Sequence, residues 1–280
     1  MKKIISLLLA FACVFSMVAC GTSETATAEV LEFDLTNEEY AFGVDKTQPE
    51  LLTQVNTFVN QIKEDGTLEE ICNKYFGDGE PEGVVSATED PSKEQLVVAT
   101  NAAFEPFEYM IGDKFYGIDM EIAALLAKEL GQELVIKHMD FNAVCLSVGQ
   151  QKCDIAMAGL TIKPDREEHV TFSESYYVAS QKLVVKSNDT TFAECKSADE
   201  AITILKGMSK DTIIGVQDGT TGQFFVQGDE SWGFEKLPTE CKTYRNGSMA
   251  IQDMLNGSID YVIIDAAPAE FITKSINEMQ

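Results

Sequence analysis

Two charged side chains have the types and places needed to hold the two ends of a small zwitterion. Arg166 carries a planar guanidinium whose forked N–H donors match a carboxylate. Asp265 follows the apolar stretch 261–264, which predicts a buried strand, and a carboxylate at the end of such a strand can face a crevice. Plainer interpretations exist for both. Arg166 would be a surface residue of the polar run 165–168, which the residues alone favour, and Asp265 would cap a helix 266–274.

A weaker signal comes from Thr220 and Thr221, which follow Gly219 and begin a predicted helix. Their N–H groups and hydroxyls could bind the same carboxylate at the positive end of that helix.

The composition argues against several other kinds of site. The chain has 46 acidic and 21 basic residues and a net charge of −25, whereas a nucleic-acid partner requires a basic surface. Only two histidines, His138 and His169, are present, and no Cys-x-x-Cys occurs, so zinc spacing is absent. We find no Ser-His-Asp set and no phosphate loop. The sequence therefore predicts no catalytic residues, no metal and no cofactor.

The first thirty residues have the pattern of a targeting segment. Lys2 and Lys3 precede the apolar run 4–18, which is short for a membrane span and is typical of a secretory signal. The following Met17-Val18-Ala19-Cys20 resembles a bacterial lipobox, which implies a signal peptide over 1–19 and a lipid on Cys20. Residues 20–30 are then expected to be a tether to the outer face of the cell membrane. Plain secretion is the alternative.

Strands and helices alternate from residue 95 onwards, which favours an α/β fold with mainly parallel strands. The alternation occurs twice, so we expect two lobes with a ligand crevice between them. Asp119 is expected to cap the first helix. The predicted strands are 96–100, 133–138, 154–158, 182–186, 213–216, 240–244 and 260–264, and the predicted helices are 119–130, 143–150, 198–205, 221–226 and 249–255.

Three stretches carry a specific resemblance: 99–109 (ATNAAFEPFEY), 159–166 (GLTIKPDR) and 215–222 (GVQDGTTG). Their sequences, order and spacing resemble the polar amino-acid receptors of ABC importers, the family 3 solute-binding proteins, over nearly all of 94–280. The resemblance implies a two-lobed type II periplasmic-binding-protein fold. It also implies a monomeric receptor, not an enzyme, that binds a free L-amino acid between its lobes and delivers it to an ABC permease.

The same resemblance implies roles for particular residues. Arg166, helped by Thr220 and Thr221, would bind the ligand's carboxylate, and Asp265 would bind its ammonium group. Since Arg166 belongs to the first lobe and Asp265 to the second, one zwitterion would bridge both lobes and favour closure. The implied ligand-binding residues are Asn101, Phe104, Phe141, Gly159, Thr161, Arg166, Thr220, Thr221 and Asp265.

The remaining implied contacts concern the ammonium group and the ligand's side chain. Gly159 would offer a backbone carbonyl and Thr161 a hydroxyl to the ammonium group. Phe104 and Phe141 would pack against the ligand's side chain, although core packing is the usual role of phenylalanine. Asn101 can donate and accept hydrogen bonds, which favours a neutral polar side chain.

The pieces of the chain stand in a different order from those of the family. Family members continue after the equivalent of 261–280 with a strand that returns to the first lobe, two helices and a Lys-Tyr-Phe-Gly ending. Here these pieces occur at the front, as a strand 40–44, a helix 49–63 and a helix from 67 to Lys74-Tyr75-Phe76-Gly77. The chain is therefore predicted to be circularly permuted. The alternative is that residues 31–78 are a remnant that does not pack.

Permutation sets the expected domain boundaries. Residues 31–77 would complete the first lobe, 78–93 would be a linker, 94–182 would form the rest of the first lobe, and 183–280 would form the second. We expect one covalent connection between the lobes near 177–183 and a second, unjoined interlobe strand near 31–35.

Two other functions remain open at this stage. Some relatives are dehydratases of cyclic acids, for which Glu105 and Glu108 would be the nearest candidate acids. A ligand sensor is the other alternative, although sensors usually carry a membrane span or signalling module after the binding domain.

Overall fold

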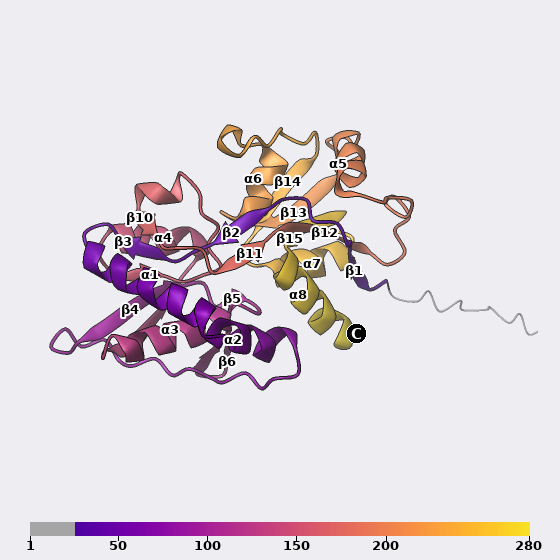
Figure 1. Ribbon diagram of the computed structural model, residues 1–280. Helices are drawn as coiled ribbons and strands as arrows, with labels where there is room; N and C mark the ends of the chain where they lie inside the picture. The colour runs from indigo at the N-terminus through magenta and orange to yellow at the C-terminus, as the bar shows by residue number, and fades with distance from the viewer. Residues whose placement is uncertain (1–25) are drawn as a thin grey trace, which may run out of the picture.

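The computed structural model describes residues 26–280, so the expected signal peptide and Cys20 lie outside the part described. Its strands form two five-stranded sheets, each with helices packed against it, and a two-stranded ribbon lies between the two (Figure 1). This is the two-lobed α/β architecture that the alternation of strands and helices predicts. Within 26–280, no helix is long and apolar enough to span a membrane.

The first lobe is built around the sheet β10-β3-β9-β4-β8. Strand β4 is parallel to β8 and β9, whereas β3 is antiparallel to both of its neighbours. Gly43 pairs with Ala156 and Val44 with Ile155, so the front of the chain completes this sheet. The strands of this lobe are β3 (Gly43–Asp45), β4 (Gln95–Thr100), β5 (Ala103–Phe104), β6 (Glu108–Ile111), β7 (Lys114–Tyr116), β8 (Glu133–His138), β9 (Ile155–Ala156) and β10 (Val170–Phe172).

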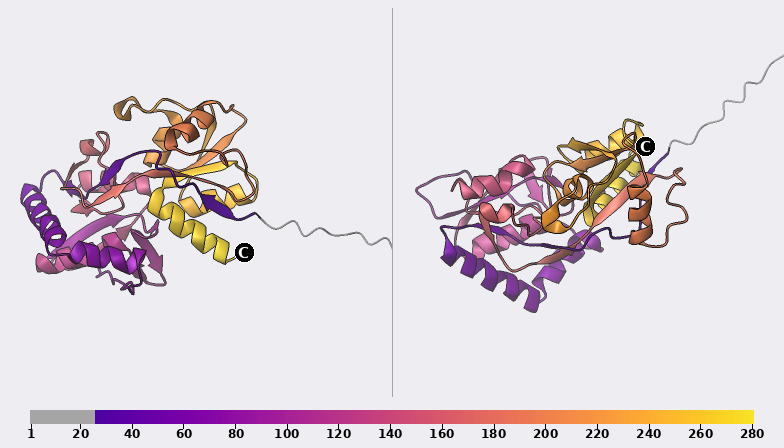
Figure 2. Two further views of the ribbon diagram at one scale, coloured as in Figure 1. Left: turned by 45° about the vertical axis from the view of Figure 1, so that its right-hand side comes forward. Right: turned by 90° about the horizontal axis from the view of Figure 1, so that it is seen from above.

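Helices α1 and α2 pack on one side of this lobe (Figure 2), where α1 contacts β3 and α2 contacts α3. An apolar stripe with helical period makes the inner face of α1. Its buried members are Leu51, Val55, Phe58, Val59 and Ile62. The helices of the lobe are α1 (Pro49–Glu64), α2 (Thr67–Phe76), α3 (Ile118–Glu129), α4 (Phe141–Gly149) and the short η1 (Arg166–Glu168).

The second lobe is built around the sheet β1-β12-β15-β13-β14. Strand β13 is parallel to β14 and β15, and β12 is antiparallel to β15. The strands are β1 (Ala28–Val30), β12 (Gln181–Lys186), β13 (Ile213–Gln217), β14 (Glu240–Tyr244) and β15 (Tyr261–Asp265), and the helices are α5 (Ala198–Lys206), α6 (Thr221–Gln227), η2 (Glu230–Trp232), α7 (Gly247–Leu255) and α8 (Ala266–Glu278).

The chain passes between the two sheets twice, not once as expected. Strands β2 (Glu38–Tyr40) and β11 (Tyr177–Ala179) form the antiparallel ribbon at this hinge. The earlier crossing lies at β2 rather than at residues 31–35. Residues 31–35 instead run alongside β12 of the second lobe, because the amides of Leu31 and Leu35 donate to the carbonyls of Leu183 and Gln181 at 2.9 and 2.8 Å.

The N-terminal strand β1 is part of the second lobe, so the expected tether ends before Ala28 and not at residue 30. Ala28 is buried and pairs with Lys186 on β12. Its backbone also exchanges two hydrogen bonds with Asn277 of α8: its N–H donates to Oδ1 at 2.9 Å, and Nδ2 donates to its carbonyl at 2.8 Å. The two ends of the described chain are therefore tied together (Figure 1).

The expected linker 78–93 runs against the first lobe without regular secondary structure apart from one bridge. Val84 and Phe115 exchange backbone hydrogen bonds of 2.7 and 2.9 Å, and the Ala87 amide donates to the Leu134 carbonyl at 2.8 Å. The segment thus connects α2 to β4 along the edge of β7 and β8.

Candidate functional site

Polar contacts join the lobes across the crevice between them. The Thr221 hydroxyl donates to the Thr161 hydroxyl at 3.3 Å, and Asn142 Nδ2 donates to Asp218 Oδ2 at 2.6 Å. In each pair one residue belongs to each lobe. A pocket of about 390 Å³, lined by residues of both lobes that include Asn142 and Asp218, opens beside the second pair. The lobes are therefore closed on each other in this structure.

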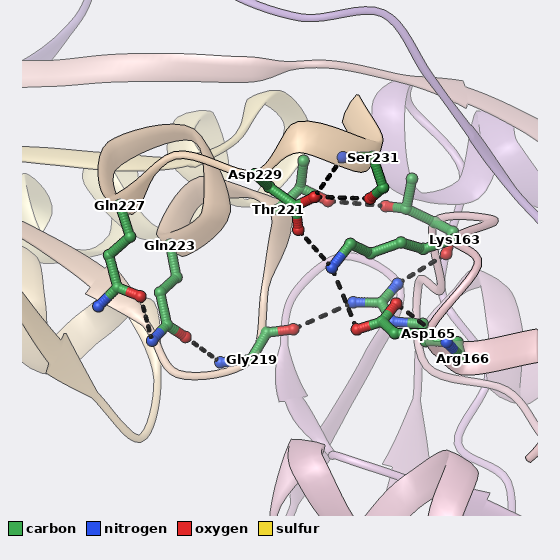
Figure 3. Close-up of polar contacts among 10 residues, drawn as sticks. Lys163, Asp165, Arg166, Gly219, Thr221, Gln223, Gln227, Asp229 and Ser231 are labelled. Carbon is green, nitrogen blue, oxygen red and sulfur yellow. Dashed lines mark hydrogen bonds and ion pairs between the residues drawn. The ribbon is translucent and has the colours of Figure 1, made fainter. Parts of the chain in front are cut away.

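Arg166 lies at the start of η1, in the loop after β9, and is 8% exposed. Its Nη1 donates to the Thr161 carbonyl at 2.7 Å, and its Nη2 donates to the Gly219 carbonyl of the opposite lobe at 3.1 Å (Figure 3). The Phe141 ring lies 5.2 Å from the guanidinium carbon. Throughout residues 26–280, no carboxylate lies within ion-pair distance of Arg166.

This arrangement corrects the plainer interpretation of Arg166 as a surface residue. Its guanidinium is buried and retains N–H donors beyond the two that bond to backbone carbonyls. A buried cation that has no anion of its own is suited to an incoming carboxylate.

Gly219 allows the opposite lobe to approach Arg166. Its φ is +77°, and a Cβ there would lie 1.8 Å from Oδ1 of Asn142 across the crevice. The two threonines after it, Thr220 and Thr221, make different contacts. The Thr220 hydroxyl donates to the Gln217 carbonyl at 2.8 Å within its own lobe, whereas the Thr221 hydroxyl reaches across the crevice.

Asp265 ends β15 and directly precedes α8, as predicted, but its side chain does not cap the helix. Its carboxylate instead accepts a hydrogen bond from the Tyr40 hydroxyl. Burial and the neighbouring carboxylate of Glu38 raise the pKa of Asp265 to about 7. In the described part of the chain no lysine or arginine pairs with it. It is a carboxyl group withdrawn from water, with no cation beside it in residues 26–280.

Residues that the sequence did not single out connect these two charges. Glu38 of β2 accepts from the Thr161 hydroxyl at 2.8 Å and from Gln181 Nε2 at 3.1 Å. Gln181 is the register partner of Asp265 in the second-lobe sheet. One buried hydrogen-bonded network therefore joins Thr161, whose carbonyl binds Arg166, to the strand pair that carries Asp265.

Asn101 and Gln217 form a second buried pair across the crevice. Asn101 Nδ2 donates to the Met139 carbonyl at 2.7 Å, which directs Oδ1 toward the opposite lobe. That oxygen accepts from Gln217 Nε2 at 3.3 Å. Gln217 is 1% exposed, and its Oε1 has no hydrogen-bond partner among residues 26–280. Gln217 lies inside the motif 215–222, but nothing in that motif indicates that its side chain faces Asn101.

Phe104 lies beside Gly159, since a Cβ on Gly159, whose φ is +52°, would be 2.9 Å from the Phe104 ring. The Gly159 amide donates to Asp119 at 2.9 Å, and the Tyr176 hydroxyl donates to the same carboxylate. The prediction that Asp119 caps α3 is therefore wrong: Gly117 is the N-cap, and Asp119 is a buried acid. Burial raises the pKa of Asp119 to about 7.

Of the two acids considered for catalysis, Glu105 is half-buried and Glu108 is fully buried. Neither carboxyl oxygen of Glu108 has a hydrogen-bond partner in the described chain. Burial, with smaller effects from Asp119 and Asp265, raises the pKa of Glu108 well above its usual value. Burial thus favours the neutral form of the Glu108 carboxyl.

Cysteines and metal ligands contribute nothing to the site as described. The five cysteines of residues 26–280 are free: Cys72, Cys145, Cys153, Cys195 and Cys241. Over the same range no cluster of three or more His, Cys, Asp or Glu side chains could hold a metal ion.

Comparison with known proteins agrees with the two-lobed fold. Residues 96–274 match the profile of the bacterial extracellular solute-binding proteins, family 3. The arginine-binding extracellular protein ArtP of Bacillus subtilis (strain 168) is 31% identical over 201 residues, which are 71% of each chain.

Two solved structures are also similar. An ancestral arginine-binding protein bound to glutamine has 32% identity and a TM-score of 0.54, over 65% of this chain and 74% of the other. The ancestral amino acid-binding protein AncCDT-1, a precursor of cyclohexadienyl dehydratase, has 26% identity and a TM-score of 0.55, over 75% of this chain and 78% of the other.

Proposed function

Because the chain belongs to family 3 of the bacterial extracellular solute-binding proteins, we propose that it binds a free polar L-amino acid between its lobes and delivers it to an ABC permease. One observation carries the proposal: among residues 26–280, the buried guanidinium of Arg166 has no paired carboxylate and the buried carboxyl of Asp265 has no paired cation, and the two residues belong to opposite lobes. A zwitterion supplies both missing charges. Thr161 and Thr221 line the path between them.

The polar atoms near Asn101 favour a ligand side chain that donates hydrogen bonds. Asn101 donates one N–H to Met139 and Gln217 donates one to Asn101, while the buried acceptor Gln217 Oε1 has no partner among residues 26–280. Amide, guanidinium and ammonium side chains satisfy such acceptors, whereas a carboxylate is repelled. L-Glutamine and L-arginine are therefore the first ligands to test. Phe104 and Phe141 would flank the ligand's side chain.

Binding and closure are one process in this scheme. The ligand's carboxylate contacts Arg166 on the first lobe and its ammonium group contacts Asp265 on the second, so the ligand binds the closed arrangement better than an open one. The antiparallel ribbon of β2 and β11 is the connection about which the lobes would move.

Calorimetry of Arg166→Ala with L-arginine and L-glutamine tests the assignment. We expect loss of measurable binding, because truncating one partner of a buried charge pair costs about 2–5 kcal/mol. The fold should persist, with an unchanged circular-dichroism spectrum. Lys210→Ala, at an exposed lysine after α5, is the control and should bind as the wild type does. Undiminished affinity in Arg166→Ala would refute the assignment.

We also propose that the chain is circularly permuted, with the boundaries 31–77, 78–93, 94–182 and 183–280 adjusted for β1. The family profile covers 96–274 and leaves the front of the chain unmatched. That front segment nevertheless supplies β3 to the first-lobe sheet and packs α1 and α2 against it. A protein re-ligated as 95–280 followed by 26–77 should fold and bind the same ligand; an insoluble or non-binding product would count against the proposal.

A lipid anchor on Cys20 is proposed from the lipobox-like sequence 17–20. It would hold the receptor, as a monomer, on the outer face of the cell membrane. Metabolic labelling with a fatty acid should mark the wild type and not Cys20→Ser. Label that persists in Cys20→Ser would exclude this site.

We propose binding rather than turnover. Similar proteins include ArtP, which is named as a binding protein, and an amino acid-binding precursor of a dehydratase. Of the two candidate acids for dehydration, Glu108 has a fully buried carboxyl without a hydrogen-bond partner in residues 26–280, and Glu105 is half-buried. Incubation with a cyclohexadienyl carboxylic acid should leave the acid unchanged; dehydrated product would favour the enzyme.

A further inference from the structure

Lys163 is a lysine buried at the contact between the lobes. It lies in the first-lobe loop between β9 and η1, and its side chain is 4% exposed. Its Nζ is 2.9 Å from Asp229 Oδ2 and 3.1 Å from Asp165 Oδ2 (Figure 3). It also lies 3.4 Å from the centre of the Phe224 ring, close enough for a cation–π interaction.

The partners of Lys163 are divided between the lobes. Asp165 belongs to the same loop as Lys163, whereas Phe224 of α6 and Asp229 belong to the second lobe. Separation of the lobes would leave the ammonium group with Asp165 and water, and would remove Phe224 and Asp229. The Lys163–Asp229 pair is therefore made only when the crevice is closed.

Asp229 is held ready for this contact by its own lobe. Its Oδ1 accepts from the Ser231 amide at 2.9 Å and from the Ser231 hydroxyl at 2.6 Å, which leaves Oδ2 for Lys163. The hydrogen bonds from Ser231 and Lys163 lower the pKa of Asp229. The carboxylate is thus ionised and oriented, so little side-chain entropy is lost when the pair forms.

We propose that Lys163 and Asp229 form an interlobe latch that slows ligand release without touching the ligand. None of the partners of Lys163 is a residue proposed to contact the amino acid. The inference rests on the proposed function, since a latch on the closed state acts on any ligand that the closed state holds. Lys163 is a positioning residue in this scheme: it stabilises the arrangement in which Arg166 and Asp265 face one ligand.

Stopped-flow dissociation and calorimetry with L-arginine and L-glutamine test the latch in Lys163→Met, Asp229→Asn and the double variant. Asp229→Asn keeps the acceptor for Ser231 and Lys163→Met keeps the apolar stem, so both should fold. We expect each single variant to release ligand about tenfold faster and to bind about tenfold more weakly. The double variant should release ligand no faster and bind it no more weakly than either single variant, because the same Lys163–Asp229 pair is lost in all three.

The matched control is Glu235→Gln, which removes an exposed carboxylate paired with Lys206 at 2.7 Å within the second lobe. Its ligand release rate and its affinity should match those of the wild type within twofold. A release rate within twofold of wild type in Asp229→Asn, or additive effects in the double variant, would overturn the latch. A wild type that binds none of the twenty amino acids would instead refute the proposed function.

Small-angle scattering of the ligand-free proteins tests the latch without any ligand. Loss of the pair should shift the population toward open forms, so the radius of gyration of Asp229→Asn should exceed that of the wild type and of Glu235→Gln. Equal radii in all three proteins would overturn the latch.

Discussion

Individual charges in the crevice are placed where water cannot stabilise them. Arg166 is held by two backbone carbonyls and Asp265 by one tyrosine hydroxyl; both are buried, and neither is ion-paired within residues 26–280. The sequence could indicate these two residues because their types and motif positions carry the information. It could not indicate Glu38 and Tyr40, because they lie 123 and 225 residues from their partners Thr161 and Asp265.

The raised pKa of Asp265 predicts that ligand affinity falls in acid. Its value of about 7 in the ligand-free protein means that below pH 7 the carboxyl is largely protonated and does not attract an ammonium group. The dissociation constant should therefore rise as pH falls from 8 to 5, approaching tenfold per pH unit. Calorimetry between pH 8 and 5 measures this change in the dissociation constant.

Asp265→Asn should bind weakly at every pH with a flat profile, because the titrating group is gone. A variant that keeps the wild-type pH profile would assign the titration to another group.

At the scale of single helices and strands, the sequence pattern predicts some elements correctly and not others. The alternation of strands and helices correctly predicted β4, β8, α5, β13 and β15, because local propensity and packing agree there. Tertiary contacts decided the rest. Asp119 looks like a helix cap in sequence, but the approach of Gly159 and Tyr176 buries it within α3 instead.

Strand β1 is the clearest case of an element set by long-range contacts. Residues 20–30 have the composition of a tether, yet Ala28–Val30 joins the second-lobe sheet because β12 offers a free edge and Asn277 binds the Ala28 backbone. The segment that precedes the earlier crossing is thus attached to the second lobe by hydrogen bonds and packing.

Asn277→Ala should weaken the attachment of β1 to the second lobe. It removes two hydrogen bonds, each worth about 0.5–1.5 kcal/mol. Hydrogen exchange of the amides in β1 should accelerate roughly tenfold or more, while exchange in β4 of the first lobe stays unchanged. Asn256→Ala, at an exposed helix end, is the control. Unaltered exchange in β1 would show that Asn277 does not hold the strand.

At the scale of the whole molecule, the fold buries several acids that have no paired cation in the described part of the chain. Asp119 and Asp265 each have a pKa of about 7, and that of Glu108 is raised well above its usual value. Between pH 4 and 7 the folded state therefore binds more protons at these sites than the unfolded state does. Stability from these groups is present in acid and is lost as pH rises through 7.

The ligand-free protein should consequently be more stable at pH 5 than at pH 7.5, by an amount on the order of a few kcal/mol. Urea unfolding at the two pH values measures the difference. Asp119→Asn should reduce it, since one of the titrating groups becomes neutral at both pH values. Higher stability at pH 7.5 than at pH 5 in the wild type would contradict this expectation.

The most direct test of the whole account is a thermal-unfolding series with the twenty free amino acids and with N-acetylated and amidated forms of the best one. A ligand that binds only the folded protein raises the unfolding temperature. We predict that at least one amino acid with a hydrogen-bond-donating side chain raises it, and that capping either the ammonium group or the carboxylate removes the effect. No rise with any amino acid, or an equal rise with a capped form, would contradict a crevice in which Arg166 and Asp265 bind the two ends of one ligand.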